Sequence, residues 1–244
     1  MSNCKIIHPD VFHLTQPKTG GDTSFPLGLG QQGVHEVCEA SFGDMASLTG
    51  FCLAVAKPRP GPIAWISQRA LSFDHGHASL IGSQRFRHAP VEALIVRTNK
   101  WMETLWAVEE AIRSSAVSLV IAEVKRLDFT AVRRLTLTSH RHGIPVLLLL
   151  PYTHEGASTA AARWRIGSRP SAPNALDPAA PGHTRWRATL ERSRTTPTMA
   201  GKVFDFELND ETLSLSLVSE LAPHTPIQDQ PRASPSGLAL QRRA

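Results

Sequence analysis

The stretch Ile144-Pro145-Val146-Leu147-Leu148-Leu149-Leu150 decides the fold class, because it is a continuous apolar run of strand length. Such a run predicts a strand buried on both faces, since a strand with one wet face would alternate apolar and polar residues. A second run of this kind, rich in β-branched residues, covers 117–122. Between the two runs, Asp128 can cap a helix and Gly143 lies just past its end. A buried strand, a helix and another buried strand in succession predict a parallel α/β sheet.

The same alternation of strands and helices reaches back to residue 34. Short strands are predicted at 34–38, 62–66 and 93–97. A helix is predicted at 44–56, with Asp44 as its cap. Another helix begins at Thr98, and its apolar stripe consists of Trp101, Leu105, Val108 and Ile112. Residues 67–90 carry few periodic signals, so no element is predicted there.

After Pro151 the pattern changes to strict alternation. Apolar residues alternate with basic or polar ones at 162–166, 186–190 and 204–208, and Leu213, Leu215 and Leu217 offer one more strand. This pattern predicts half-buried strands that extend the sheet in antiparallel or mixed fashion. Trp164 and Trp186 would then lie in the core, and the arginines beside them would point outward.

The chain divides into three parts by composition. Residues 1–25 are polar and broken by Pro and Gly, and we expect an N-terminal arm. Residues 26–220 form one domain, in which the proline-rich residues 167–183 make an exposed loop. Residues 221–244 contain several prolines and no aromatic side chain, which predicts a disordered tail.

The positive charge of the chain is concentrated in one segment. The 244 residues hold 26 Lys and Arg against 21 Asp and Glu, a net charge of +5. Residues 156–197 contain seven arginines and two acids, and seven minus two accounts for the whole excess. Such a patch suits a phosphate backbone or an acidic protein face, and a merely solvated face is the alternative. The arginines proposed for DNA or partner binding are Arg163, Arg165, Arg185, Arg187, Arg192 and Arg194.

Composition also excludes several classes of protein. No apolar run is long enough to cross a bilayer, and no secretory signal is recognisable. Three cysteines cannot all pair, so we expect a reduced, cytoplasmic protein, with Cys38 and Cys52 in the core. The clusters Asp74-His75-Gly76-His77 and His140-Arg141-His142 lack the helical spacing of a zinc site, so no metal is predicted.

The loop after the first predicted strand is where a nucleotide hydrolase would bind phosphate. Such a loop needs glycines and a Lys before Ser or Thr. The loop Glu39-Ala40-Ser41-Phe42-Gly43-Asp44-Met45-Ala46-Ser47 has one glycine and no lysine, and no Lys or Arg lies between residues 19 and 56. Glu39 and Asp44 bring negative charge where a triphosphate needs positive charge. The nucleotide-loop positions Glu39, Gly43, Asp44, Met45 and Ser47 are therefore degenerate, and we predict no tight ATP binding, no cofactor and no catalysis.

Glu123 follows the buried run at 119–122, where the metal-binding acid of a nucleotide hydrolase would lie. The alternative is a strand-end carboxylate satisfied by local amides, and the missing lysine favours it. The strand at 62–66 is followed by Ser67-Gln68-Arg69, which offers no carboxylate to activate water.

Several stretches together resemble a known family. Leu27-Gly28-Leu29-Gly30 and Gly33-Val34-His35-Glu36-Val37 resemble the entry to the ATPase core of RecA recombinases. More specific blocks are Leu105-Trp106-Ala107-Val108-Glu109-Glu110-Ala111-Ile112-Arg113-Ser114, Arg133-Arg134-Leu135, Arg163-Trp164-Arg165-Ile166 and Pro181-Gly182-His183-Thr184-Arg185-Trp186. With these blocks, residues 25–210 resemble the ImuA family.

The resemblance implies a RecA-like core and a role in damage-inducible, SOS-type mutagenesis. Family members are RecA-like accessory proteins whose cassette partners are ImuB, a polymerase-like scaffold, and an error-prone DNA polymerase. By this resemblance, Arg192 and Arg194 fall where RecA filaments carry basic residues toward a neighbouring subunit, which would suit docking to RecA or to a second copy. Weak non-specific DNA binding and association with the nucleoid are also expected. A RecA-like ATPase and a SulA-like inhibitor of cell division remain the alternatives.

Overall fold

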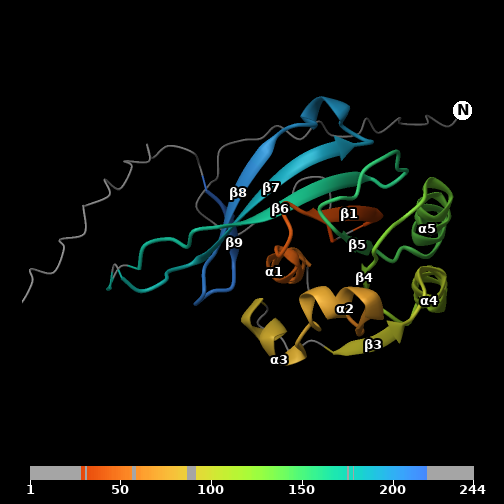
Figure 1. Ribbon diagram of the computed structural model, residues 1–244, viewed down its shortest axis with the longest axis horizontal. Coiled ribbons are helices and arrows are strands. Elements are labelled where there is room, and N and C mark those ends of the chain that lie inside the picture. Colours follow the sequence, from red (N-terminus) through yellow and green to blue (C-terminus); the bar gives the residue numbers. More distant parts are fainter. Residues whose placement is uncertain are drawn as a thin grey trace, which may run out of the picture.

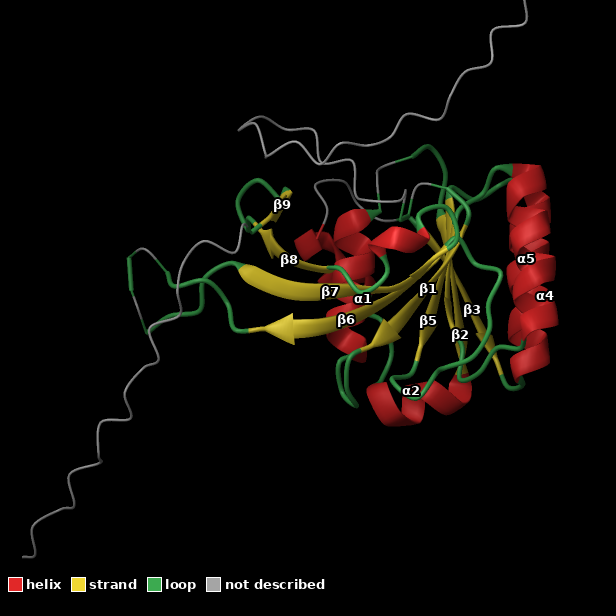
Figure 2. Cartoon of the chain, turned by 90° about the horizontal axis from the view of Figure 1, so that it is seen from above, coloured by secondary structure: helices red, strands yellow, loops and turns green. Residues whose placement is uncertain are grey.

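The computed structural model describes residues 29–30, 32–56, 59–86, 92–174, 176–177 and 179–218. The predicted arm at 1–25 and the predicted tail at 221–244 lie outside the described residues. Within that part of the chain, one nine-stranded sheet has the order β3-β2-β4-β5-β1-β6-β7-β8-β9. Figures 1 and 2 show this sheet running through the whole domain.

The first six strands are parallel and form the α/β half that the buried runs predicted. They are β1 (Val34–Glu39), β2 (Ile63–Gln68), β3 (Ala93–Thr98), β4 (Leu119–Glu123), β5 (Val146–Leu150) and β6 (Ala162–Arg169). The last three strands join in antiparallel fashion, and they are β7 (Thr184–Ser193), β8 (Val203–Leu208) and β9 (Leu215–Leu217). The predicted fold class is thereby confirmed, including the antiparallel extension in the C-terminal third.

Helices cover both faces of the parallel half (Figure 2). On one face, α4 (Trp101–Ser114) and α5 (Phe129–His142) pack on an apolar layer that includes Val34, Val120 and Val146. On the other face, α1 (Met45–Val55) packs on a layer that continues under the antiparallel strands. There Phe51 of α1 meets Trp186 at a ring-centroid distance of 5.8 Å. Both predicted core tryptophans, Trp164 and Trp186, are fully buried, as are Cys38 and Cys52.

The helix ends follow the predicted signals only in part. The Asp128 side chain accepts a hydrogen bond from the Ala131 amide at 2.7 Å, and Gly143 ends α5 with a φ of 69°. Asp44 lies at the cap position of α1 but makes no cap hydrogen bond, which corrects the prediction for that residue. The helix expected from Thr98 begins at Trp101 instead, because Thr98 still belongs to β3.

Residues 67–90, for which no element was predicted, contain three short helices. They are α2 (Arg69–His75), α3 (Leu80–Ser83) and the 3-10 helix η2 (Gln84–Phe86). Among the described side chains of α2, only Leu71 is buried, so no apolar stripe marks this helix in the sequence. A further 3-10 turn, η3 (Pro197–Met199), links β7 to β8.

The predicted loop at 167–183 is shorter than expected, because β6 continues through Arg169. Beyond the strand ends, Pro173 and Pro181 form an isolated antiparallel bridge. The hairpin of β6 and β7 therefore projects from the domain (Figure 1).

Candidate functional site

Glu39 ends β1 at the place where a phosphate-binding loop would begin. Its side chain is fully buried, and His75 Nδ1 lies 3.9 Å from its Oε1. Among the described residues, neither carboxylate oxygen has a hydrogen bond of ordinary geometry. Burial raises the pKa of Glu39, although His75 and the backbone amides of Tyr152 and Met45 oppose the rise. The first turn of α1, whose amides carry the positive end of the helix dipole, thus faces a carboxylate of the protein itself.

Asp44 holds the loop between β1 and α1 against β6. Its carboxylate accepts hydrogen bonds from Ser41 Oγ at 2.9 Å and from Ser168 Oγ at 2.8 Å. Burial would raise the pKa of Asp44, but the hydrogen bonds from Ser168 and Ser41 outweigh it and lower the pKa. A Cβ on Gly167 would lie 2.9 Å from the Ala40 Cβ, so the loop packs closely on β6.

The remaining positions of this loop present no cation. Gly43 is exposed with a φ of 99°, Met45 is buried in the core, and Ser47 is half-buried on α1. Glu39, Asp44 and Met45 lie around the start of α1, and the degenerate nucleotide loop stays a prediction.

Glu123 at the end of β4 is bound to a side chain that the sequence did not point to. Trp65 Nε1 donates a hydrogen bond to Glu123 Oε1 at 2.7 Å, and both side chains are buried. The expected partners were local amides, and the actual partner is an indole on the neighbouring strand. Burial raises the pKa of Glu123, opposed by the Trp65 hydrogen bond and by His75. His75 therefore opposes the rise in the pKa of both Glu39 and Glu123.

Four of the predicted binding arginines are committed to ion pairs. Arg163 meets Glu36 at 2.6 Å, Arg187 meets Asp205 at 2.7 Å and Arg185 meets Glu207 at 2.6 Å, whereas Arg165 meets Glu191. Each pair joins neighbouring strands on the face opposite the tryptophans, so alternation gave the correct face. The expectation of a freely solvated positive face is wrong for these four, because acids on β1, β7 and β8 neutralise them. Arg163 departs furthest, since only 6% of its side chain is exposed.

Arg192 and Arg194 differ from the other four arginines. Both are exposed, and Arg192 Nη1 donates to the Gly156 carbonyl oxygen at 3.2 Å. In the described part of the chain, neither guanidinium has an acidic partner. Among the described residues, the arginines of the segment that lack an ion pair are therefore Arg169 at the end of β6 and Arg192 and Arg194 at the end of β7.

Two further features concern the described residues. None of their helices has the length and apolar character needed to span a membrane. No group of three or more His, Cys, Asp or Glu side chains in that part of the chain is arranged to hold a metal ion.

Comparison with known proteins identifies relatives along most of the chain. Two curated proteins named "Protein ImuA", from two strains of Caulobacter vibrioides, are each 31% identical to this chain over 221 residues. The matched region covers 83% of this chain and 87% of each relative. No protein-family model matches the chain.

Proposed function

Because the chain belongs to the ImuA family, we propose that it is a non-catalytic accessory protein of error-prone translesion DNA synthesis. The family is that of the ImuA–ImuB damage-inducible mutagenesis system. In this proposal the protein acts by binding partners, first an ImuB-like polymerase scaffold, and then RecA or an error-prone polymerase. It does so without turning over ATP.

The observation that carries the non-catalytic part is the position of the Glu39 carboxylate. It is buried beside the first turn of α1, where a phosphate-binding loop would present its amides to the nucleotide. A triphosphate there would meet the buried Glu39 side chain and the Asp44 carboxylate, whose pKa is lowered, with no lysine in the loop to offset the charge of Asp44. In this proposal Glu123 has a structural role, because it accepts the hydrogen bond from the Trp65 indole.

Exposed apolar side chains on α4 support partner binding. Trp106 and Met102 lie one helical turn apart, and 62% and 60% of their surfaces are exposed. Large exposed apolar residues that adjoin one another mark interaction sites, and tryptophan is enriched among residues that dominate binding energy. We propose this strip of α4 as a contact for the ImuB-like partner.

The experiment is complementation of a host strain that lacks this gene, with damage-induced mutation frequency as the readout. The unaltered chain and Glu123→Gln should both restore induced mutagenesis, because no hydrolysis is required. Trp106→Ser should fail to restore it and should weaken co-purification with the ImuB-like protein about tenfold or more.

Phe73→Ser is the matched control, since Phe73 is 82% exposed and belongs to another helix, α2. It should behave like the unaltered chain in both assays. Equal losses for Trp106→Ser and Phe73→Ser would remove the support for α4, and a folded Glu123→Gln protein that fails to complement would count against a non-catalytic role.

A further inference from the structure

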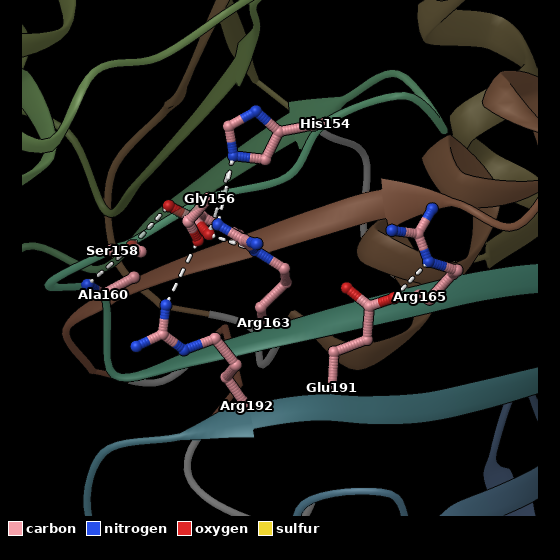
Figure 3. A network of polar contacts seen from close by, with 9 residues as sticks. His154, Gly156, Ser158, Ala160, Arg163, Arg165, Glu191 and Arg192 are labelled. Carbon is pink, nitrogen blue, oxygen red and sulfur yellow. Dashed lines mark hydrogen bonds and ion pairs between the residues drawn. The ribbon is translucent and has the colours of Figure 1, made fainter.

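A small cavity lies where β1, β6, β7 and the loop before β6 meet. Its volume is about 90 Å³, and its polar lining consists of Glu36, Ser158, Arg163, Arg192, Ser193 and Arg194. We call it the β7-end cavity. Figure 3 shows Arg163 and Arg192 approaching the loop near Gly156 from adjacent strands.

A bulge in β7 brings the charged residues to this cavity. Trp164 pairs with Leu190, but the preceding Arg163 pairs with Arg192, so Glu191 is an extra residue in β7. The bulge lets Glu191 reach Arg165 while Arg192 lies opposite Arg163. Without it, strand alternation would turn Arg192 toward the apolar face.

The buried side of the cavity is already satisfied. Glu36 accepts hydrogen bonds from Arg163 Nε at 2.6 Å and from Ser158 Oγ at 2.5 Å. Arg163 Nη2 lies 3.2 Å from His154 Nε2, and burial is the main reason that the pKa of His154 is lowered. Arg163 is thereby fixed in place, with its charge balanced by one carboxylate.

The outer side of the cavity carries charge that nothing described balances. Three guanidinium groups line the cavity together with one carboxylate, and that carboxylate is bound to Arg163. Arg192 is directly opposite Arg163 in register, and because Glu36 balances Arg163, the charge of Arg192 has no acidic partner in the described part of the chain. Arg194 lies just past the end of β7, where its amide donates to the Ala161 carbonyl oxygen at 2.9 Å, and it also lines the cavity.

We infer that the β7-end cavity is a binding site for phosphoryl groups, with Arg192 and Arg194 as the residues that contact them. Guanidinium groups match the geometry of phosphate oxygens, and Ser158 and Ser193 add hydroxyl groups at the rim. Two exposed arginines that line one cavity favour the backbone of a nucleic-acid strand, which offers phosphates in succession. The inference goes beyond the proposed function, which requires only protein partners.

The test is binding of a fluorescein-labelled single-stranded oligothymidine, followed by anisotropy at several NaCl concentrations. Arg192→Gln/Arg194→Gln should weaken binding about tenfold or more at low salt and reduce the slope of log K against log salt by roughly 1.4, the value for two lost contacts. The control is Arg133→Gln/Arg141→Gln, which removes two exposed arginines from α5 and therefore has the same net charge as the Arg192→Gln/Arg194→Gln variant. We expect it to change affinity less than about twofold.

Competition separates the possible sources of the anion. Inorganic phosphate should displace the oligonucleotide from the unaltered chain. If deoxyadenosine monophosphate binds as tightly as the oligonucleotide, the ligand of the site is a free nucleotide and not a nucleic-acid strand. Equal losses in the two double variants would overturn the inference, because only net charge would matter. Polyglutamate serves as a probe for an acidic protein partner. If Arg192→Gln/Arg194→Gln loses polyglutamate binding but keeps oligonucleotide binding, the inference is overturned in favour of such a partner.

Two measurements keep the result interpretable. The melting temperatures of both double variants should stay near that of the unaltered chain, since these side chains are exposed. If the Arg192→Gln/Arg194→Gln variant unfolds, Arg194→Gln alone replaces it in the binding test and should lose about half as much of the slope of log K against log salt. Co-purification with the ImuB-like protein should persist in Arg192→Gln/Arg194→Gln, so failure of this site and failure of the proposed function are distinguishable.

Discussion

Replacing Arg163 with glutamine should destabilise the fold far more than the same change at any of its neighbours on the charged face. The Arg163 and Glu36 side chains are 6% and 1% exposed and lie 2.6 Å apart. Removing one partner of a buried pair leaves a buried charge uncompensated, at a typical cost of about 3–5 kcal/mol. Ser158 still donates to Glu36 in the variant. We therefore expect a loss at the lower end, about 3 kcal/mol.

Arg187→Gln is the matched control for this prediction. Its pair with Asp205 has the same kind of geometry, at 2.7 Å, but 35% of the Arg187 side chain is exposed. Asp205 has a lowered pKa because Arg187 donates hydrogen bonds to it, yet solvent screening keeps such a pair at about 0–1 kcal/mol. Both variants remove one arginine of an ion pair, and the large difference between the pairs is burial, so the comparison reports mainly the cost of desolvated charge.

Thermal and urea unfolding measure both effects. For a domain of this size, 1 kcal/mol shifts the melting temperature by about 2–4 °C, so Arg163→Gln should melt roughly 6–12 °C lower and Arg187→Gln at most about 4 °C lower. Glu36→Leu/Arg163→Met should recover much of the loss, because replacing both charges removes the unpaired one. Equal melting temperatures for the two single variants would refute the reasoning from burial.

Further predictions concern buried groups and one close backbone approach. Burial lowers the pKa of His35 from 6.5 to about 4, so between these pH values the unfolded chain binds a proton that the folded chain does not. The free energy of unfolding should therefore fall by about 3 kcal/mol as the pH drops from 7 to 4. His35→Leu should lose this part of the pH dependence, and an unchanged dependence would contradict a buried neutral imidazole. Cys38, whose pKa burial raises to about 12, and Cys52 should resist alkylation in the native state, as site-resolved mass spectrometry would show, and rapid labelling of either would mean that the core opens. Gly182→Ala should disturb the β6–β7 hairpin, because the added Cβ would lie 2.3 Å from the Ala172 carbonyl oxygen. We expect faster proteolysis within the hairpin, and an unaltered cleavage rate would show that the turn accommodates the added methyl group.

The fold could be predicted from the sequence where burial alone determines the pattern. The runs that became β4 and β5 are buried on both faces, and no other element accommodates continuous β-branched or leucine residues of that length. Alternation likewise placed Trp164 and Arg163 on opposite faces of β6. What alternation omits is register, and register decides that Arg163 meets Glu36 across the sheet, 127 residues away.

The candidate sites depended on features that sequence patterns do not carry. The bulge at Glu191 changes which face Arg192 occupies, and a one-residue insertion leaves no distinct signal in an arginine-rich strand. The absence of a lysine predicted a degenerate nucleotide loop, but the burial of Glu39 depends on α2, which supplies His75 and shows no apolar stripe.

The central claim, that this protein acts without hydrolysing ATP, is tested most directly by phosphate release from ATP with and without single-stranded DNA. The purified chain of 244 residues should release no phosphate above a protein-free blank in either condition. Glu123→Gln should be indistinguishable from it, because Glu39 faces the first turn of α1 and Trp65 holds Glu123. Turnover comparable to that of a recombinase, lost in a folded Glu123→Gln variant, would contradict the account.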